Sequence, residues 1–450
     1  MMMKTAVKNI GILGLGRVGR SITDYLLGKD VRLSLFDENP QAYLHKSIKL
    51  VLESNLAQRI DSPRALTDAD LVIKSPGIPE DAEWIKEIDA AGVEMIDEVE
   101  FTWRELGRPL TVAVTGTNGK STTTAWTAEV LKAGGLSAFC GGNLAPGRPF
   151  SEALSERPYD VYVVEVSSFQ LERCPDFKPH VGVLLNVTAD HLNRHSAEEY
   201  LELKLSLFKN HTSGDYSILN ADDRQTTANI SSIPGRHIFF SVKKKDADFY
   251  YDNEGLYSGG GRIINRSQLL LPGMHNVANA LAASAVASSL GIETGKIAWG
   301  LQRFSGLPHR MQYLGKLDQR PVFNNSMCTN PEAFYHSVHA FDDSSVIIAG
   351  GTEKGLPLDA FIAGVRERAK FLVLFGENAG KLADILERED FSSCVIVDSL
   401  RAALQAALEN SRPGERILFS PGFASFGNFK NFEERGHAFI KAYRRISARR

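Results

Sequence analysis

The sequence is poor in cysteine and has no long hydrophobic run. It contains 4 cysteines in 450 residues, and no two of them have the CxxC spacing of a zinc knuckle. This pattern argues against a disulfide framework as the basis of the fold. No apolar run reaches the ~20 residues that a membrane-spanning helix needs, and the first residues lack the apolar core of a signal peptide. We therefore expect a cytoplasmic protein without a membrane span.

The sequence also lacks a large excess of charge of one sign. Lys and Arg number 51 against 54 Asp and Glu, which gives a formal net charge of −3. Nucleic-acid-binding proteins usually carry a basic excess, so the composition gives no reason to expect a nucleic-acid partner. Hydrophobic residues make up 43% and charged residues 23% of the chain, which is typical of folded globular proteins.

Length and the alternation of strand-like and helix-like segments predict a multi-domain α/β protein. At roughly 100–200 residues per domain, 450 residues correspond to two to four domains. A Gly- and Tyr-rich stretch at 250–261 predicts a hairpin, and an Ala-rich run at 273–290 predicts a helix. We predict three domains: a Rossmann-like domain at 1–106, a central phosphate-loop ATPase-type domain with a parallel sheet at 107–306, and a Rossmann-like domain at 307–450.

A first glycine loop follows the apolar strand at Ile10–Leu13. Gly14, Gly16 and Gly19 fit the G-x-G-x-x-G pattern in full, and Asp37 ends the next predicted strand. Such glycines let backbone amides and a helix N-terminus approach a pyrophosphate. The pattern indicates a nucleotide-diphosphate ligand. The pattern does not distinguish a nicotinamide from other groups attached to the diphosphate, so NAD remains one possible ligand. A tight turn that binds no ligand is the other alternative.

A second glycine loop follows the strand predicted at Leu110–Val114. The run from Thr115 to Thr122 ends in the G-K-S of a phosphate loop, although Val114 stands where a strict motif has its first glycine. Gly116 and Gly119 let amides face phosphates, and Lys120 supplies a positive charge. This loop indicates ATP, which argues against a simple NAD-dependent oxidoreductase.

Two further residues in the central segment suggest a metal site. Glu165 ends the strand Val161–Val164, and His191 follows the next predicted strand, so both are expected at one edge of a parallel sheet. A carboxylate beside a phosphate loop is placed to hold Mg²⁺. Taken singly, each would more often be an ordinary surface polar residue.

Lys204 lies on the apolar side of a predicted helix. Ser196 and Glu199 fit a capping box, and Leu201 and Leu205 share the face of Lys204. Such a lysine either extends its ammonium to solvent, pairs, or loses its charge. A neutral buried amine can react with CO₂ to form a carbamate, which would be a metal-binding anion. Lys209, one step off the stripe, is expected to be solvated.

Together these motifs resemble the ATP-dependent Mur ligases, over essentially the whole chain, and most of all the members that add D-glutamate. The segments that carry the resemblance are 115–124, 141–143, 165–170, 186–191, 273–279, 307–310 and 420–432. The resemblance implies that ATP phosphorylates a carboxylate of UDP-N-acetylmuramoyl-L-alanine and that the amine of D-glutamate then attacks the acyl phosphate. It also implies two Mg²⁺ sites, a carbamylated Lys204, and a monomer.

The resemblance assigns site residues by matched position. The catalytic set is Lys120, Glu165, His191 and Lys204, and the metal set is Ser121, Glu165, His191 and Lys204. ATP would be held by Gly116, Thr117, Asn118, Gly119, Lys120, Ser121, Thr122, Asn143, Asn276, Asn279 and Arg310. The UDP-sugar would be held by Gly14, Leu15, Gly16, Arg17, Val18, Asp37, Ser75, Pro76 and Gly77, and the amino acid by Thr329, Lys354, Ser425 and Phe432.

The match breaks in the C-terminal segment. The family's Asp-Ser-Lys-Ala-Thr-Asn stretch reads Asn-Ser-Met-Cys-Thr-Asn at 325–330, so Asn325 replaces an acid and Met327 replaces a lysine. Asn193 and Gly427 also replace aspartates. One alternative is therefore a ligase for another amino acid, such as L-glutamate, or for another acceptor; a binding-only homologue and an NAD-dependent oxidoreductase are more remote. Cys328 is expected to be a small apolar filler.

Overall fold

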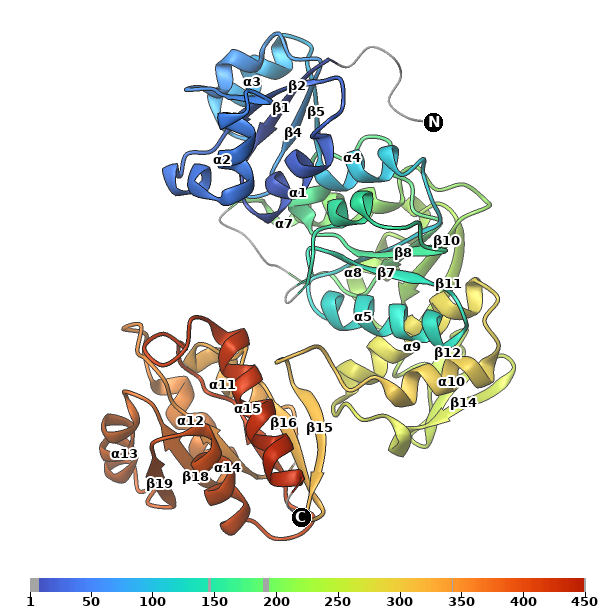
Figure 1. Cartoon of the computed structure of the whole chain (residues 1–450). Coiled ribbons are helices and arrows are strands. Elements are labelled where there is room, and N and C mark those ends of the chain that lie inside the picture. The colour runs from blue at the N-terminus through green and yellow to red at the C-terminus, as the bar shows by residue number, and fades with distance from the viewer. Residues whose placement is uncertain (1–7, 145–146, 189–193, 342, 449–450) are drawn as a thin grey trace. The chain divides into compact units, whose positions relative to one another are not determined.

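The computed structural model describes residues 8–144, 147–188, 194–341 and 343–448 (Figure 1). The chain forms two compact units, Met1–Gln268 with Val277–Gln302, and Leu269–Asn276 with Arg303–Arg450. The first unit contains two sheets and the second contains one. Each sheet falls within one of the three predicted segments, while the boundaries at 106 and 306 stay a prediction. In the part of the chain that is described, no helix has the length and apolarity needed to cross a membrane.

The N-terminal sheet is parallel, with the strand order β3-β2-β1-β4-β5. Its strands are β1 (Asn9–Leu13), β2 (Arg32–Phe36), β3 (Ala57–Arg59), β4 (Leu71–Lys74) and β5 (Glu94–Asp97), with helices α1 (Arg17–Leu26), α2 (Lys46–Glu53) and α3 (Glu83–Ala90). The order reverses between β1 and β4, so the loops that follow these two strands lie next to each other at the switch point. In open α/β sheets this is the usual ligand position.

The central sheet has nine strands in the order β14-β13-β12-β11-β10-β9-β6-β8-β7. The parallel strands are β6 (Thr111–Thr115), β7 (Ala138–Gly142), β8 (Val161–Glu165), β9 (Val181–Leu184), β10 (Tyr216–Asn220), β11 (Arg236–Ser241) and β12 (Phe249–Tyr251). The antiparallel β13 (Gly255–Ser258) and β14 (Gly261–Asn265) confirm the predicted hairpin.

Among the described residues, seven α-helices lie between residues 98 and 303 of the chain, and the first of them, α4, also contacts β4 and β5 of the N-terminal sheet. They are α4 (Glu98–Glu105), α5 (Lys120–Ala133), α6 (Ser168–Leu171), α7 (Ala197–Leu205), α8 (Arg224–Ala228), α9 (Met274–Ser289) and α10 (Thr294–Arg303). The predicted Ala-rich helix is α9. The predicted capping box at Ser196 is present, with the Ser196 side chain accepting from the Glu199 N–H at the start of α7. A buried cluster with Phe139, Val164 and Phe208 packs one face of the sheet.

The C-terminal sheet has the order β15-β16-β20-β17-β18-β19. Its strands are β15 (Gln312–Leu317), β16 (Arg320–Asn324), β17 (Ser345–Ala349), β18 (Ala369–Phe375), β19 (Cys394–Val397) and β20 (Ile417–Phe419), and its helices are α11 (Pro331–Val338), α12 (Asp359–Arg368), α13 (Ala379–Arg388), α14 (Leu400–Glu409) and α15 (Phe432–Ser447). Four of the strands coincide with the apolar runs of the sequence. The antiparallel β15–β16 hairpin and the long helix α15 carry weaker local signals, because polar residues interrupt their apolar pattern.

Glu98, the first residue of α4, makes the stability of the fold depend on pH. Its side chain is buried, its carboxylate accepts the Ser151 N–H, and burial raises the pKa of Glu98 to about 7 from its ordinary 4.5. As the pH rises from about 4.5 to about 7, Glu98 loses its proton in the unfolded chain but keeps it in the folded chain. The free energy of unfolding therefore falls over this range, and the fall is complete above pH 7. Glu98→Gln should therefore stabilise the protein by about 2–3 kcal/mol at pH 8 and by much less at pH 5. Thermal melts at both pH values test this, with the exposed Glu38→Gln as control; a gain that does not depend on pH would contradict it.

Candidate active site

The phosphate loop joins β6 to α5 in the conformation that its glycines allow. Gly116 has φ +146° and Gly119, the N-cap of α5, has φ +86°. A Cβ at Gly119 would lie 2.5 Å from the Asn279 Oδ1, so both backbone conformation and space require glycine there. The loop thus ends at the N-terminus of α5, where helix amides and the helix dipole favour an anion.

Side chains hold the loop in place. Lys120 folds back over it, and its Nζ donates to the carbonyls of Gly116 and Thr117, at 2.9 Å each. The Asn118 N–H donates to the Asn186 Oδ1 at 2.8 Å, and the Asn186 Nδ2 returns a bond to the Asn118 carbonyl at 3.1 Å. The support from Asn186 was not predicted; its only signal in the sequence is an amide directly after a strand.

Glu165 and Ser121 occupy positions suited to a metal beside this loop. In the register of the parallel pair, Glu165 at the end of β8 lies opposite Val114 of β6. Its side chain is 3% exposed, and Ser121, in the first turn of α5, is 8% exposed. A carboxylate and a hydroxyl are hard oxygen donors of the kind Mg²⁺ prefers, so these residues fit the ion. His191 and Asn193 lie outside the described residues, and among the described ones no group of three His, Cys, Asp or Glu is placed to hold a metal.

Lys204 does not extend to solvent. It is 1% exposed, and its Nζ donates to the Thr115 Oγ1 at 3.1 Å, directly below the phosphate loop. The same nitrogen lies 5.1 Å from the centre of the Tyr200 ring, and the Tyr200 hydroxyl is 3.2 Å from the Thr117 Oγ1. Helix α7 therefore contacts the loop through two side chains, and Lys209 is exposed as expected.

The predicted ATP contacts outside the phosphate loop belong to both units. In the first unit, the Asn143 N–H donates to the Glu165 carbonyl at 3.0 Å, and the Asn279 Oδ1 accepts from the Thr123 Oγ1 at 3.1 Å. In the second unit, the Asn276 Nδ2 donates to the Pro272 carbonyl at 2.7 Å, and Arg310 is exposed. Asn143 and Asn279 thus lie at the phosphate-loop edge of the central sheet.

In the first glycine loop, Gly14 and Gly19 are packed closely against other parts of the chain, whereas Gly16 borders open space. A Cβ at Gly19 would lie 1.9 Å from the Gly14 carbonyl oxygen, and one at Gly14 would lie 2.6 Å from the Ser75 Cβ. A Cβ at Gly16 would meet no described atom within 4 Å. Gly16 is therefore not required by packing within the chain, and the space beside it is open.

The other residues predicted to bind the UDP-sugar lie on the first glycine loop, at the end of β2 and on the loop after β4. The Asp37 Oδ2 accepts the Leu15 N–H at 2.6 Å, so this carboxylate orients the loop from within. Exposed Arg17 donates to the Gly147 carbonyl of the central domain, and Val18 is half-buried. Ser75 and Pro76 are half-buried and Gly77 is exposed, on the loop after β4.

In the second unit, three of the four predicted amino-acid contacts line two hollows. Thr329 and Lys354 line one small hollow, and Ser425 lines another of about 380 Å³. Thr352 and Ala424 line both. Phe432 begins α15 and accepts the Ser326 hydroxyl on its carbonyl at 2.7 Å.

The substituted residues at 325–328 fit their surroundings without a charge. The Asn325 Oδ1 accepts the Met311 N–H at 3.1 Å, and its Nδ2 donates to the Ser420 Oγ at 3.2 Å. Cys328 is buried in the apolar cluster under α11, and burial raises the pKa of its thiol, so it is inert packing as expected. Met327 is half-buried.

Arg435 is a residue of this region that sequence reasoning missed. It is fully buried on α15, and its guanidinium donates to the Ser326 Oγ and carbonyl and to the carbonyls of Phe423 and Ala424, at 2.8–3.1 Å. Burial lowers the pKa of Arg435 to about 10. The guanidinium thus ties together the two loops that precede Thr329 and Ser425. The only hint of its burial in the sequence is that Arg435 precedes Phe439 by four residues, which places both on one face of the helix.

Arg435→Lys should destabilise the protein, because the three donors of one ammonium nitrogen cannot replace four hydrogen bonds that three separate guanidinium nitrogens make to two loops. We expect a loss of about 1–3 kcal/mol, the scale for leaving a buried carbonyl without a donor. Denaturant unfolding measures it, with the exposed Arg444→Lys on the same helix as control. Equal midpoints for the two variants would contradict the assigned role.

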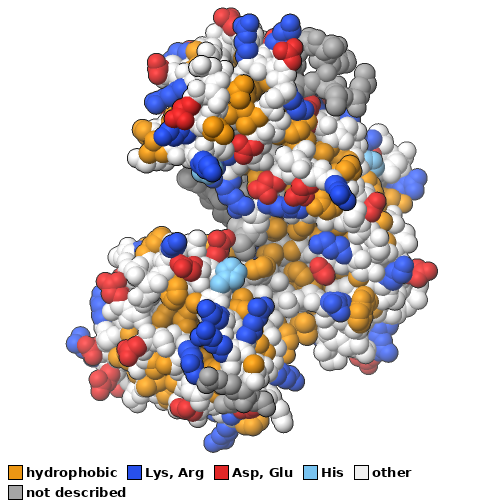
Figure 2. Space-filling view, in the orientation of Figure 1, with side chains coloured by type: hydrophobic (Ala, Val, Ile, Leu, Met, Phe, Trp, Pro, Cys, Tyr) orange, Lys and Arg blue, Asp and Glu red, His pale blue; other side chains and the backbone are white. Residues whose placement is uncertain are grey.

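The basic face of α15 was also not predicted. His437, Lys441, Arg444 and Arg445 of this helix line a hollow of about 590 Å³, together with the buried His309 from outside the helix, and no acidic residue is in its described lining. Figure 2 shows Lys and Arg side chains gathered over this helix. The face carries positive potential, which raises the local concentration of anions.

Comparison with protein families gives three consecutive matches. Residues 8–97 match the Mur ligase MurD-like N-terminal domain, residues 114–287 the Mur ligase middle domain, and residues 309–423 the Mur ligase glutamate ligase domain. Curated relatives named UDP-N-acetylmuramoylalanine–D-glutamate ligase include those of Pelotomaculum thermopropionicum (36% identical, 96% of each chain covered), Geotalea uraniireducens (35%, 99% of each) and Streptococcus uberis (35%, 98% of this chain and 97% of the relative).

Solved structures share the fold. The UDP-N-acetylmuramate-alanine ligase MurC of Thermotoga maritima superposes with a TM-score of 0.56 at 20% identity, covering 98% of this chain and 99% of its own. MurF of Acinetobacter baumannii gives 0.54 at 16% identity, covering 85% and 93%. At these identities the likeness concerns the three-domain α/β architecture alone.

Proposed function

The chain belongs to the Mur ligase family, and from this premise we propose that it joins D-glutamate to UDP-N-acetylmuramoyl-L-alanine and converts ATP to ADP and phosphate. The observation that carries the proposal is the meeting of the phosphate loop, Glu165 and the buried Lys204 at one edge of the central sheet. These residues lie in a chain that matches such ligases over 96–99% of its length.

The proposed reaction has two steps. A carboxylate oxygen of the L-alanyl group attacks the γ-phosphorus of ATP, giving an acyl phosphate and ADP. The neutral amine of D-glutamate then attacks the acyl carbon, and the C–O bond to phosphate breaks as the amide forms and the amine loses a proton. Lys120 would leave the carbonyls of Gly116 and Thr117 and bind the phosphate oxygens, where its charge offsets the negative charge of the transition state.

Two Mg²⁺ ions are part of the proposal. Bound beside the phosphate loop, they would neutralise phosphate oxygens during phosphoryl transfer. Ser121 and Glu165 would hold one ion, and His191 with Lys204 the other. Lys204 would serve as a carbamate, formed when its neutral amine attacks CO₂ and releases a proton, which changes the side chain from a cation to an anion. Its burial beneath the loop supports this chemistry, because an ammonium is costly to bury and an oxygen anion could reach a metal there.

The remaining predicted residues would hold the other substrates. Gly14 to Val18, Asp37 and the Ser75–Gly77 segment would take the UDP-sugar, and the open space at Gly16 supports a diphosphate there. Asn143, Asn276, Asn279 and Arg310 would surround the adenine nucleotide. Thr329, Lys354, Ser425 and Phe432 would bind the amino acid, with the Lys354 ammonium for its carboxylate. The protein would act as a cytoplasmic monomer.

A ligase for another amino acid, such as L-glutamate, is the second candidate. The observation that favours it is the loss of two charges at Asn325 and Met327, because Asn325 is satisfied by neutral partners. A changed charge pattern near the amino-acid contacts would alter the choice of substrate.

Phosphate release tests both candidates. The assay contains UDP-N-acetylmuramoyl-L-alanine, MgATP, bicarbonate and, in separate reactions, each of the twenty standard amino acids or D-glutamate. Release with D-glutamate alone supports the proposal, and release with a different amino acid supports the second candidate. No release with any of them would reject both for this acceptor.

A further inference from the structure

The loop after β4 is held by two cations, one from each domain of the first unit. We define it as the Ser75–Ile78 loop. Arg194, in the central domain, donates through its two terminal nitrogens to the carbonyls of Pro76 at 2.9 Å and Ile78 at 3.0 Å. Lys74, the last residue of β4, donates to the same Ile78 carbonyl at 2.7 Å. The loop's conformation therefore depends on a residue that lies 116 positions further along the chain.

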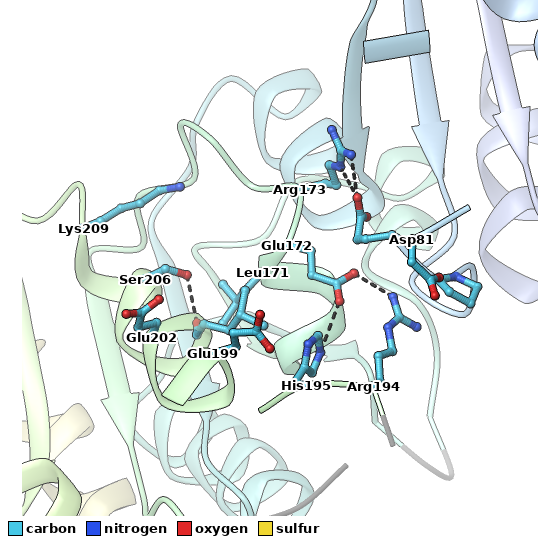
Figure 3. A pocket seen from close by; sticks show the side chains of 13 residues that line it. Asp81, Leu171, Glu172, Arg173, Arg194, His195, Glu199, Glu202, Ser206 and Lys209 are labelled. Atoms are coloured by element: carbon cyan, nitrogen blue, oxygen red, sulfur yellow. Dashed lines mark hydrogen bonds and ion pairs between the residues drawn. The ribbon is translucent and has the colours of Figure 1, made fainter. Parts of the chain in front are cut away.

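Glu172 joins the two cations. It follows α6, its side chain is 6% exposed, and its carboxylate accepts from Arg194 at 2.7 Å and lies 3.7 Å from the Lys74 Nζ. His195 approaches the other carboxylate oxygen at 3.2 Å, and Figure 3 shows Arg194 and His195 converging on Glu172. Burial raises the pKa of Glu172, while Arg194 and Lys74 oppose that shift. Buried charges of this kind are stable only with their partners in place.

The Ser75–Ile78 loop contacts the first glycine loop directly. A Cβ at Gly14 would lie 2.6 Å from the Ser75 Cβ, and the Ser75 N–H donates to the Leu13 carbonyl at 2.8 Å. A displacement of the Ser75–Ile78 loop would therefore disturb Gly14, where the first glycine loop begins. Neighbouring Arg173 offers a contrast: it also links the two domains, through Glu80 and Asp89, and it reaches the loop only indirectly, because Glu80 lies 2.8 Å from the Lys74 Nζ.

We propose that Arg194 and Glu172 are positioning residues for the sugar-nucleotide site: through the Pro76 and Ile78 carbonyls, the central domain sets the conformation of the loop that contacts the UDP-sugar. The inference rests on the proposed function, since it takes the N-terminal domain as the UDP-sugar site. Arginine suits the task because its planar guanidinium presents donors in a fixed, spread geometry that reaches two carbonyls and one carboxylate, whereas the donors of a lysine ammonium all lie on one atom.

The test compares Arg194→Ala and Arg194→Lys with the matched control Arg173→Ala in the full chain. Calorimetry measures the Kd of UDP-N-acetylmuramoyl-L-alanine without ATP, and kinetics give kcat and the KM of each substrate. For Arg194→Ala we expect the Kd and KM of the sugar nucleotide to rise about 10- to 100-fold, with the KM of ATP and of the amino acid within about 3-fold. Arg194→Lys should be intermediate, and Arg173→Ala should stay within about 3-fold.

Chemical rescue separates positioning from general destabilisation. The network borders a hollow of about 840 Å³ lined by both domains, so free guanidinium can reach the space left in Arg194→Ala. Added guanidinium should lower the KM of the sugar nucleotide for that variant and not for Arg173→Ala. An unchanged Kd in Arg194→Ala, or an equal rise in all three KM values without rescue, would overturn the inference. If the unmodified protein does not bind this sugar nucleotide, the proposed function fails instead.

Discussion

Replacing Lys120 with alanine should lower amino-acid-dependent phosphate release roughly 100- to 1,000-fold, the scale for removing one preorganised charge from a transition-state site. The ammonium lies over the loop, 2.9 Å from the carbonyls of Gly116 and Thr117, and reaches phosphate oxygens by a change of rotamer. Because negative charge moves among these oxygens during transfer, kcat should fall more than the affinity for ATP. Initial rates of phosphate release and a nucleotide-binding titration measure the two quantities.

Lys132→Ala is the matched control for this experiment. Lys132 lies in the last turn of the same helix α5 and is exposed, so its removal changes the net charge equally without touching the loop. We expect its turnover to stay within about twofold of the unmodified protein. Retained turnover in Lys120→Ala would show that the phosphate loop is not the site of the reaction.

Lys204→Ala should also abolish most turnover, by about 100-fold or more, and short carboxylic acids should restore part of it. The expectation follows from the carbamate proposed above: alanine leaves a cavity beside Thr115, and a small carboxylate that enters it supplies the missing anion. Phosphate release with and without acetate or formate measures the rescue. The unmodified protein should lose activity when CO₂ and bicarbonate are removed and regain it when bicarbonate is added.

Lys209→Ala, five residues on and exposed, controls for the loss of a lysine from this segment and should be silent. Depletion of CO₂ acts on the unmodified chain, so it tests the carbamate even if Lys204→Ala folds poorly. Activity that is insensitive to CO₂, together with an Ala variant that no carboxylate rescues, would leave Lys204 as a support for Thr115 and nothing more.

Features with a short-range cause could be predicted from the sequence. The two glycine loops are visible because positive φ at Gly14 and Gly119 and close packing at Gly19 demand glycine within a few residues of a strand. The capping box at Ser196 is equally local, since its two hydrogen bonds span three residues. The parallel strands follow from short apolar runs, which need only local composition to be recognised.

The environment of each reacting or supporting side chain was decided by the tertiary structure. The sequence placed Lys204 on an apolar stripe but left a solvent-directed ammonium open; the position of α7 under β6 brings its nitrogen to Thr115, 89 residues away. Arg435 and Arg194 gave almost no local signal, because their acceptors are backbone carbonyls of distant loops, and every residue type has such carbonyls. The sequence by itself therefore determined the loops and the family, since backbone sterics are local. The burial and the partners of the charged side chains depended on sheet order and helix packing, which arise only when distant segments meet.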